Sequence, residues 1–276
     1  MRNFWEQLGK IDRRIVYLFV FLGASAPLFL HVVPKFKASP EVVQAYQAID
    51  ELPAGSVVLF SIDYDAASMP ELQPLLEAML THVFRKDLKV LMMGHWPLWL
   101  PLGQIALEKM AKRYNKKYGE DYVFLGYRPG LAAVILNMGK EIRTVFNVDY
   151  KGTPLDSLPL MRNIHNYNDI ALLVGFEAGA VGDYWVQFAQ ARFQQKIILA
   201  ATAVVWPDLY PYLQAHQIVG LIGGLRGAAD YEVLVNQPGS ASTGMASQTV
   251  VHILIVVFIL LGNLGYYFTR TWRKPT

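Results

Sequence analysis

The sequence predicts a doubly wound α/β domain, with a mainly parallel sheet in three layers, flanked by N- and C-terminal transmembrane helices. Two long apolar segments, 15–33 and 250–268, predict the helices because neither contains Lys, Arg, Asp or Glu. Between them, short continuous apolar runs alternate with amphipathic segments. This alternation is typical of buried parallel strands with helices on both faces.

The C-terminal segment 250–268 has the length and composition of a membrane-spanning helix. At about 1.5 Å per residue it is long enough to cross roughly 30 Å of hydrocarbon. Tyr266, Tyr267 and Trp272 lie at its end, where aromatic rings favour the membrane–water boundary, and basic residues follow. Asn263, between two glycines, gives the segment a closely packing polar face and is a candidate contact with another helix.

The N-terminal segment 15–33 has two interpretations. Its basic lead, apolar core and small residues Ala24, Ser25 and Ala26 resemble a secretory signal peptide with its cleavage site. However, the apolar run continues past Ala26, and Pro27 would follow the cut directly. We therefore expect an uncleaved transmembrane helix, kinked near Pro27.

The flanking charges predict the orientation of the chain. Residues 1–14 and 269–276 together hold seven Lys and Arg, whereas few basic residues lie near the inner ends of the two apolar segments. The positive-inside rule then makes these ends cytoplasmic tails and places residues 34–249, the α/β domain with its linker, outside the cytoplasm. The expected location is the membrane, with the domain in the periplasm or on the outer face.

Composition excludes several classes of function. Removing the seven basic and two acidic tail residues from totals of 25 and 22 leaves 18 basic and 20 acidic residues in the middle of the 276-residue chain. A nucleic-acid-binding domain normally shows a basic surplus, so we expect no nucleic-acid partner. The chain has no cysteine, which excludes disulfides, thiolate metal sites and a Cys nucleophile.

Hydrophobic spacing predicts the elements between the two apolar segments. The expected helices cover 40–50, 70–85, 103–118, 131–138, 182–195 and 207–215. The expected strands cover 57–62, 88–93, 122–125, 142–148, 170–174, 196–201 and 218–222. Residues 149–168 form a loop, and 236–248 form a polar linker. We expect one sheet of five to seven strands; the alternative is two lobes on either side of the loop.

Polar side chains follow several of the expected strands. Asp63, Asp65, His95 and Glu177 come at or just after strand ends. Ligands bind beyond the carboxyl ends of the strands in open parallel sheets, so these four residues are the candidate catalytic residues. Asp63, Asp65 and His95 are also candidate ligands of a divalent cation, although the two aspartates equally suit the capping of the next helix. No cofactor is predicted, and a divalent metal remains possible.

Two arginine-containing turns are candidate ligand-binding sites. Arg128 follows the strand at 122–125, and Gly223, Gly224 and Arg226 follow the strand at 218–222. Bare backbone amides beside an arginine suit an anion, but the pattern is neither GxxxxGK[ST] nor GxGxxG. A tight strand exit with close packing is the alternative.

The segment 94–101 reads GHWPLWLP and is rich in rigid residues. Trp96 and Trp99 are candidate contacts with a partner protein or with the headgroup layer of a membrane, where tryptophan is favoured. The alternative is ordinary core packing of the two rings.

The absence of a strong catalytic motif favours binding over catalysis. The chain has no GxSxG elbow and no HExxH motif. We expect an extracytoplasmic binding or assembly module, a subunit of a membrane complex whose partners are the bilayer and other membrane subunits or further copies of itself. The alternative is a membrane-anchored hydrolase or transferase, possibly metal-dependent, acting on an envelope molecule.

Overall fold

The computed structural model describes residues 12–30, 32 and 37–271, with side chains up to Phe268. Contacts divide the chain into two compact units, Phe36–Ala241 and the terminal segments Met1–Lys35 with Ser242–Thr276. Predictions for most of the N-terminal tail, for the last residues of the segment 15–33 and for Trp272 lie outside the described residues.

The unit Phe36–Ala241 contains one sheet of six parallel strands. They are β1 (Val57–Asp63), β2 (Lys89–Gly94), β3 (Tyr122–Tyr127), β4 (Leu172–Glu177), β5 (Ile197–Ala201) and β6 (Gly220–Gly223). Their order is β3-β2-β1-β4-β5-β6, so the direction of winding reverses between β1 and β4. The predicted Rossmann-like parallel sheet is confirmed. Both halves of the sequence contribute to it, so the two-lobe alternative is wrong.

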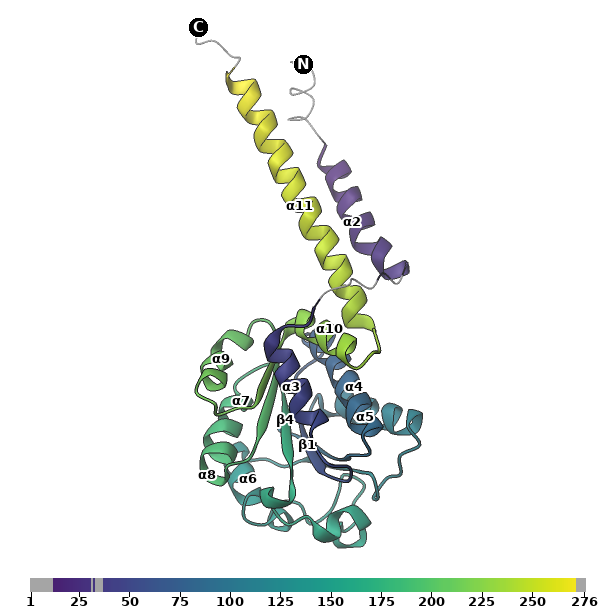
Figure 1. Ribbon diagram of the computed structural model, residues 1–276, viewed down its shortest axis with the longest axis vertical. Helices are drawn as coiled ribbons and strands as arrows, with labels where there is room; N and C mark the ends of the chain where they lie inside the picture. Colours follow the sequence, from purple (N-terminus) through teal and green to yellow (C-terminus); the bar gives the residue numbers. More distant parts are fainter. Residues whose placement is uncertain (1–11, 31, 33–36, 272–276) are drawn as a thin grey trace. The chain divides into compact units, whose positions relative to one another are not determined.

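Helices cover both faces of this sheet (Figure 1). The elements on one face are α3 (Pro40–Asp50), α4 (Met69–Arg85), α5 (Leu100–Arg113) and α10 (Gly224–Leu234). The other face carries α6 (Leu131–Met138), α7 (Val181–Tyr184), a π-helical turn (Trp185–Gln190), α8 (Ala191–Phe193) and α9 (Trp206–Gln214). The strands are therefore buried from both sides.

Strand β1 shows why these apolar runs form a covered sheet. All seven of its residues are buried. Val57 and Leu59 join the core beneath α6 and α9, whereas the alternate residues Val58 and Phe60 point to the opposite face. A continuous apolar run suits a strand with no solvent face, and this explains how the sequence predicts most strands.

Three elements differ from the prediction. The expected strand 142–148 is absent: residues Ile142–Thr144 form a 3₁₀ turn, η1, and both Ile142 and Phe146 are buried in the core. Gly223 ends β6 and Gly224 begins helix α10 directly, without a turn between them. The expected polar linker is helical from Ser240 onward.

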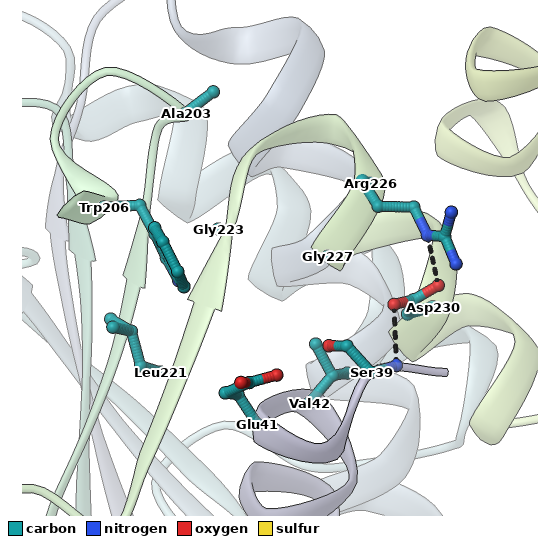
Figure 2. Close-up of a pocket in the computed structure, with 10 residues that line it drawn as sticks. All are labelled: Ser39, Glu41, Val42, Ala203, Trp206, Leu221, Gly223, Arg226, Gly227 and Asp230. Carbon is teal, nitrogen blue, oxygen red and sulfur yellow. Dashed lines mark hydrogen bonds and ion pairs between the residues drawn. The ribbon is translucent and has the colours of Figure 1, made fainter. Parts of the chain in front are cut away.

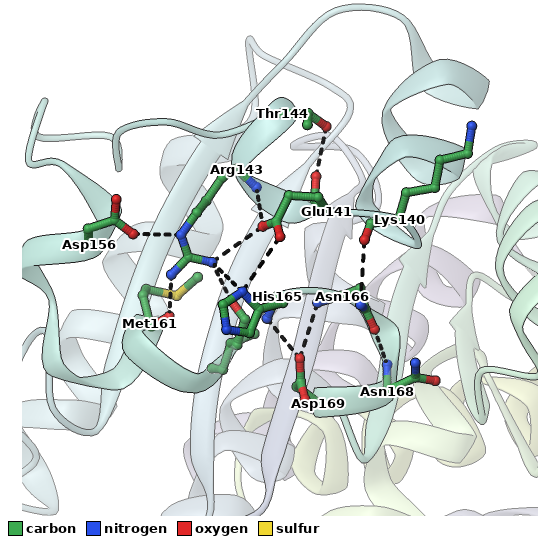
Figure 3. Close-up of polar contacts among 11 residues, drawn as sticks. Lys140, Glu141, Arg143, Thr144, Asp156, Met161, His165, Asn166, Asn168 and Asp169 are labelled. Carbon is green, nitrogen blue, oxygen red and sulfur yellow. Dashed lines mark hydrogen bonds and ion pairs between the residues drawn. The ribbon is translucent and has the colours of Figure 1, made fainter.

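Arg143 holds the long connection between α6 and β4 (Figure 3). This connection contains three further 3₁₀ turns: η2 (Leu155–Ser157), η3 (Pro159–Asn163) and η4 (Tyr167–Asp169). The Arg143 guanidinium donates to the carbonyls of Met161 and Ile164 at 2.7 and 2.8 Å and pairs with Asp156 at 2.6 Å. One planar side chain thus supplies hydrogen bonds to several turns that lack a sheet or long helix.

The terminal unit contains two helices, α2 (Arg13–Phe29) and α11 (Ser240–Thr271). Gly23 of α2 packs closely on Leu254 of α11, and the rings of Phe19 and Phe258 meet with centroids 6.2 Å apart. Among the described residues, one helix is long and apolar enough to cross a membrane by length and composition, over Ser240–Phe268. The described α2 has 17 residues and begins with two arginines. Two membrane spans therefore remain a proposal.

Candidate functional site

The reversal point of the sheet brings together three of the candidate catalytic residues. Asp63 ends β1, Glu177 ends β4, and the two are neighbours in the parallel register. The Asp63 carboxylate accepts a hydrogen bond from the backbone N–H of His95, just beyond β2, and another from the Ser61 hydroxyl, both at 2.5 Å. The predicted convergence of strand ends is therefore present in the structure.

Burial controls the protonation of this acid pair. The side chains of Asp63 and Glu177 have no exposed surface. Desolvation raises the pKa of Asp63 to about 7, although hydrogen bonds from Ser61 and His95 oppose this shift. Desolvation and the neighbouring Asp63 charge raise the pKa of Glu177 well above its usual value. Asp63 has donors that stabilise its anion, so it ionises first while Glu177 keeps its proton.

His95 is a neutral imidazole at the same strand edge. Burial lowers its pKa to about 4. Its ring lies beside Trp185 of the π-helical turn, with centroids 5.5 Å apart. Within the described residues, both ring nitrogens of His95, both carboxyl oxygens of Glu177 and the indole nitrogen of Trp185 are buried without a hydrogen-bond partner. These atoms form a polar patch inside the domain.

Small residues make space for the buried acid. A Cβ on Gly175 would lie 2.6 Å from Glu177 Oε1, and a Cβ on Gly182 would lie 3.3 Å from Glu177 Cγ. Trp96 covers the following turn, because a Cβ on Gly179 would come within 3.0 Å of its ring. The acid pair is thus closed off from solvent in this conformation, which does not suit direct contact with a substrate.

The structure separates Asp65 from the acid pair. Its carboxylate accepts hydrogen bonds from the backbone N–H and hydroxyl of Ser68 just before α4, and these bonds lower its pKa. Asp65 thus orients the loop before α4, whereas the N-cap residue of this helix is Ser68, which makes no side-chain capping bond. Among the described residues, no group of three or more His, Asp and Glu side chains is arranged to hold a metal ion. The weak metal hypothesis for Asp63, Asp65 and His95 gains no geometric support.

A cavity of about 350 Å³ opens at the carboxyl end of β6 (Figure 2). Its lining is mostly apolar, with polar groups on the side of α3 and α10. The residues are Ser39, Glu41, Val42, Ala203, Trp206, Leu221, Gly223, Arg226, Gly227 and Asp230. A concave apolar surface with a few polar groups at one side is the usual form of a small-molecule site.

Gly223 and Gly224 shape this cavity by being small. A Cβ on Gly223 would lie 2.2 Å from the indole of Trp206, so the ring rests directly on the strand backbone. Gly224 has a φ of +62° at the start of α10, and its own Cβ would crowd Ala203 at 2.9 Å. The close-packing alternative therefore accounts for both glycines, and Trp206, which packs on Gly223, lines the cavity.

The two candidate arginines have different surroundings. Arg226 lies in the first turn of α10, where its Nε donates to buried Asp230 at 2.8 Å and a terminal nitrogen donates to the Lys37 carbonyl. Asp230 also accepts from the Ser39 backbone N–H at 3.0 Å (Figure 2). Arg128 donates to two backbone carbonyls and lies over the Phe146 ring. Arg226 thus borders the cavity at β6, and Arg128 borders another, of about 300 Å³, beside β3.

The remaining candidates lie away from these groups. Trp96 and Trp99 are half-buried in the loop after β2, with exposed Pro97 and Leu98 between them. Asn263 is exposed on α11 within the terminal unit. A third cavity, of about 450 Å³, lies at the amino ends of β1 and β2, away from every predicted site residue.

Sequence reasoning missed Ser39, Trp206 and Asp230. Ser39 and Asp230 meet only because α3 packs on α10. The proline in WPDLY marked the start of α9, but no local pattern indicated that Trp206 would line a cavity.

The fold and the strand-edge groups define a Rossmann-like parallel α/β domain with a buried acid pair and a separate open cavity. No family model matches the sequence, and no curated protein matches it significantly. One similar solved structure is the C-terminal domain of a group 1 family glycosyl transferase (LpcC) from Francisella tularensis, at 15% identity and a TM-score of 0.33. The alignment covers 80% of this chain and 94% of that one. A likeness this distant carries no argument about the function of the present chain.

Proposed function

We propose that the domain is a membrane-held binding module that takes a small ligand in the cavity at the end of β6. The observation that carries this proposal is the cavity itself, about 350 Å³ and open at a strand end, where ligands of parallel sheets bind. The candidate catalytic acids Asp63 and Glu177, in contrast, have no exposed surface.

The lining supports a compact ligand with one apolar face and a polar edge. The indole of Trp206 offers a flat surface for a ring, with Leu221 on the same side of the cavity. Glu41, Arg226 and the Ser39 hydroxyl supply hydrogen-bonding groups of both kinds on the opposite side. Because acidic and basic groups border the same cavity, neutral molecules with several hydroxyl or amine groups, of the size of a sugar or nucleoside, fit better than multiply charged anions.

The membrane part of the proposal rests on α11. This helix is long and apolar enough to cross a bilayer. We further propose that the segment 15–33 forms a second span, with both tails in the cytoplasm and the domain outside, as the distribution of Lys and Arg favours. Membership of a larger membrane complex, with other subunits or further copies, is part of the same proposal.

The test is ligand-observed NMR on the full chain in nanodiscs, with a panel of methyl glycosides, nucleosides and aromatic amines. Ala203→Trp would fill the mouth of the cavity, and Val204→Trp is the matched control because Val204 is the next residue and lies outside the cavity lining. Binding by the wild type and the control, with loss in Ala203→Trp, supports the site. Binding that survives Ala203→Trp, or no binding by any panel member, contradicts it.

The alternative function, a hydrolase or transferase using Asp63, His95 and Glu177, draws on the meeting of these groups at the sheet reversal. It requires the Trp96 segment to move, since the acids are closed off. Turnover of an envelope molecule by the purified chain, abolished by Asp63→Asn without loss of folding, would replace the binding proposal with the enzyme.

A further inference from the structure

Exposed apolar side chains gather at one end of the sheet. In the described part of the domain, residues 37–241, the large exposed apolar side chains are Met69, Leu98, Ile105, Tyr184 and Val204. Each lies in a loop that leaves the carboxyl end of a strand or in the first two turns of the helix that follows. Leu98 is 74% exposed and Val204 is 84% exposed. Side chains of this kind normally contribute to a core or to a contact.

The same loops contain almost no charge. They are residues 64–68 after β1, 95–99 after β2, 178–180 after β4 and 202–205 after β5, and Asp65 is the one charged residue in their sequence. The loops at the amino ends of the strands are different. For example, the loop before β3 by itself contains four charged residues: Lys116, Lys117, Glu120 and Asp121. The loops at the carboxyl edge of the sheet are therefore much less charged than those at the amino edge.

The apolar edge is also held rigidly. Trp96 packs on the turn after β4, and Pro97 limits the backbone of the exposed tip at Leu98. In the loop after β5, the backbone N–H of Ala203 donates to the Glu71 carboxylate at 2.8 Å, which fixes the position next to Val204. Loops that are already held in one conformation lose little conformational entropy when they bind to another surface.

We propose that the carboxyl edge of the sheet, defined by Leu98, Val204 and the half-buried Trp96 and Trp99, rests in the headgroup layer of the bilayer. This inference rests on the proposed membrane anchoring by α11. Two observations indicate that a bilayer, rather than another protein, contacts this edge. Helix α11 begins at Ser240, a few residues after α10 ends at Leu234, so the domain stays within a short distance of any bilayer that α11 crosses.

The second observation is the composition of the edge. Tryptophan with leucine and valine favours the boundary between headgroups and acyl chains. The loops after β1, β2, β4 and β5 contain no Lys or Arg. Arg128, after β3, donates to backbone carbonyls, and Arg226, at the start of α10, pairs with Asp230. The contact at Leu98 and Val204 therefore depends on apolar insertion and needs no anionic lipid. Both the cavity at β6 and the one beside β3 open along this edge, so docking would bring them to the membrane surface.

The test uses the absence of cysteine from the chain. Leu98→Cys and Val204→Cys each receive an environment-sensitive dye in the full chain, reconstituted in phosphatidylcholine nanodiscs with or without brominated acyl chains. Lys117→Cys is the matched control, because its side chain is 72% exposed and lies before β3, at the opposite edge. The expected result is a blue shift and bromine quenching of the dye at positions 98 and 204, with neither at 117.

A second variant separates docking from the apolar character of the dye. With the label at position 204, Leu98→Asp is expected to reverse the blue shift, whereas Lys117→Glu leaves it unchanged. Three outcomes overturn the proposal. If the chain enters nanodiscs but no label is quenched, the edge lies in water and only the anchoring survives. If all three labels are quenched equally, the tether alone brings the domain near the lipid. If the chain does not enter nanodiscs, the anchoring itself fails.

Discussion

Replacing Asp63 by Asn should change how the stability of the domain depends on pH. The substitution keeps an oxygen that can accept from the His95 backbone N–H and removes the titrating group. In the folded wild type, burial raises the pKa of Asp63 from 3.8 to about 7. The folded state therefore holds this proton more tightly than the unfolded state. The resulting stability is complete below pH 4 and is lost as the pH rises through 7.

The size of the effect follows from the pKa difference. One pKa unit corresponds to about 1.4 kcal/mol, so the shift of Asp63 is worth roughly 4 kcal/mol across this range. His95 acts in the opposite direction. Its pKa falls from 6.5 to about 4, so its stability is present above pH 6.5 and is lost, by roughly 3 kcal/mol, as the pH falls through 4. In the wild type these two contributions oppose each other between pH 4 and 6.5.

Asp63→Asn removes the contribution of Asp63 to this pH dependence and leaves that of His95. We expect the free energy of unfolding of the variant, minus that of the wild type, to increase by roughly 4 kcal/mol between pH 4 and 7. Urea unfolding of the full chain in detergent, followed by circular dichroism at several pH values, measures this difference. Titrating groups that do not interact with Asp63 are common to both proteins and cancel. Glu177 does interact with Asp63, but its burial keeps it protonated across this pH range in both proteins.

Asp65→Asn is the matched control. Hydrogen bonds from Ser68 lower the pKa of this exposed carboxylate, so its stabilisation is present at neutral pH and is lost on acidification. This loss occurs below the unfolded pKa of 3.8, so the difference between this variant and the wild type should stay nearly constant between pH 4 and 7. A difference for Asp63→Asn that stays constant from pH 4 to 7 would refute the buried, protonated state of Asp63.

Three further substitutions test other parts of the structure. Gly223→Ala should cost about 1–3 kcal/mol of unfolding free energy by overpacking Trp206, and an unchanged melting curve would contradict the close contact. Gly23→Leu should abolish disulfide crosslinking between cysteines placed at 19 and 258, whereas Gly262→Leu, with no neighbouring atoms within 4 Å, should not. Arg143→Met should increase hydrogen exchange across 155–169, because two carbonyls lose their donor. Asp156→Ala, at the exposed end of the same ion pair, should change exchange little; equal effects would show that the carbonyl contacts do not matter.

The strands of the domain could be predicted because a strand buried on both faces is a nearly continuous run of apolar residues. The runs 57–62 and 196–201 are each apolar at every position but one and form β1 and β5 almost as expected. Helix α10 could not be predicted in the same way. Its start reads GGLRG, and glycine is a poor helix former. Glycine is needed at these positions because neighbouring residues leave no room for a Cβ: Trp206 at Gly223, Ala203 at Gly224 and Ile222 at Gly227.

The candidate site was predictable only in part. A parallel sheet brings the ends of its strands to one edge, and this placed Asp63, His95 and Glu177 together correctly. Their burial depends on Trp96 and Trp185, which come from different segments. The cavity at β6 depends on a contact between Ser39 and Asp230, far apart in the sequence, that no local pattern encodes.

The order of strands also has a consequence for synthesis of the chain. β1 ends at Asp63, but β4, its partner on one side, begins only at Leu172. At about 5–20 residues per second, that side of β1 stays without its neighbour for roughly 5 to 20 s after translation of the first strand. An unpaired apolar strand can join the wrong chain during this time. Correct assembly of the domain thus depends on how β1 is protected before the second half of the sheet leaves the ribosome.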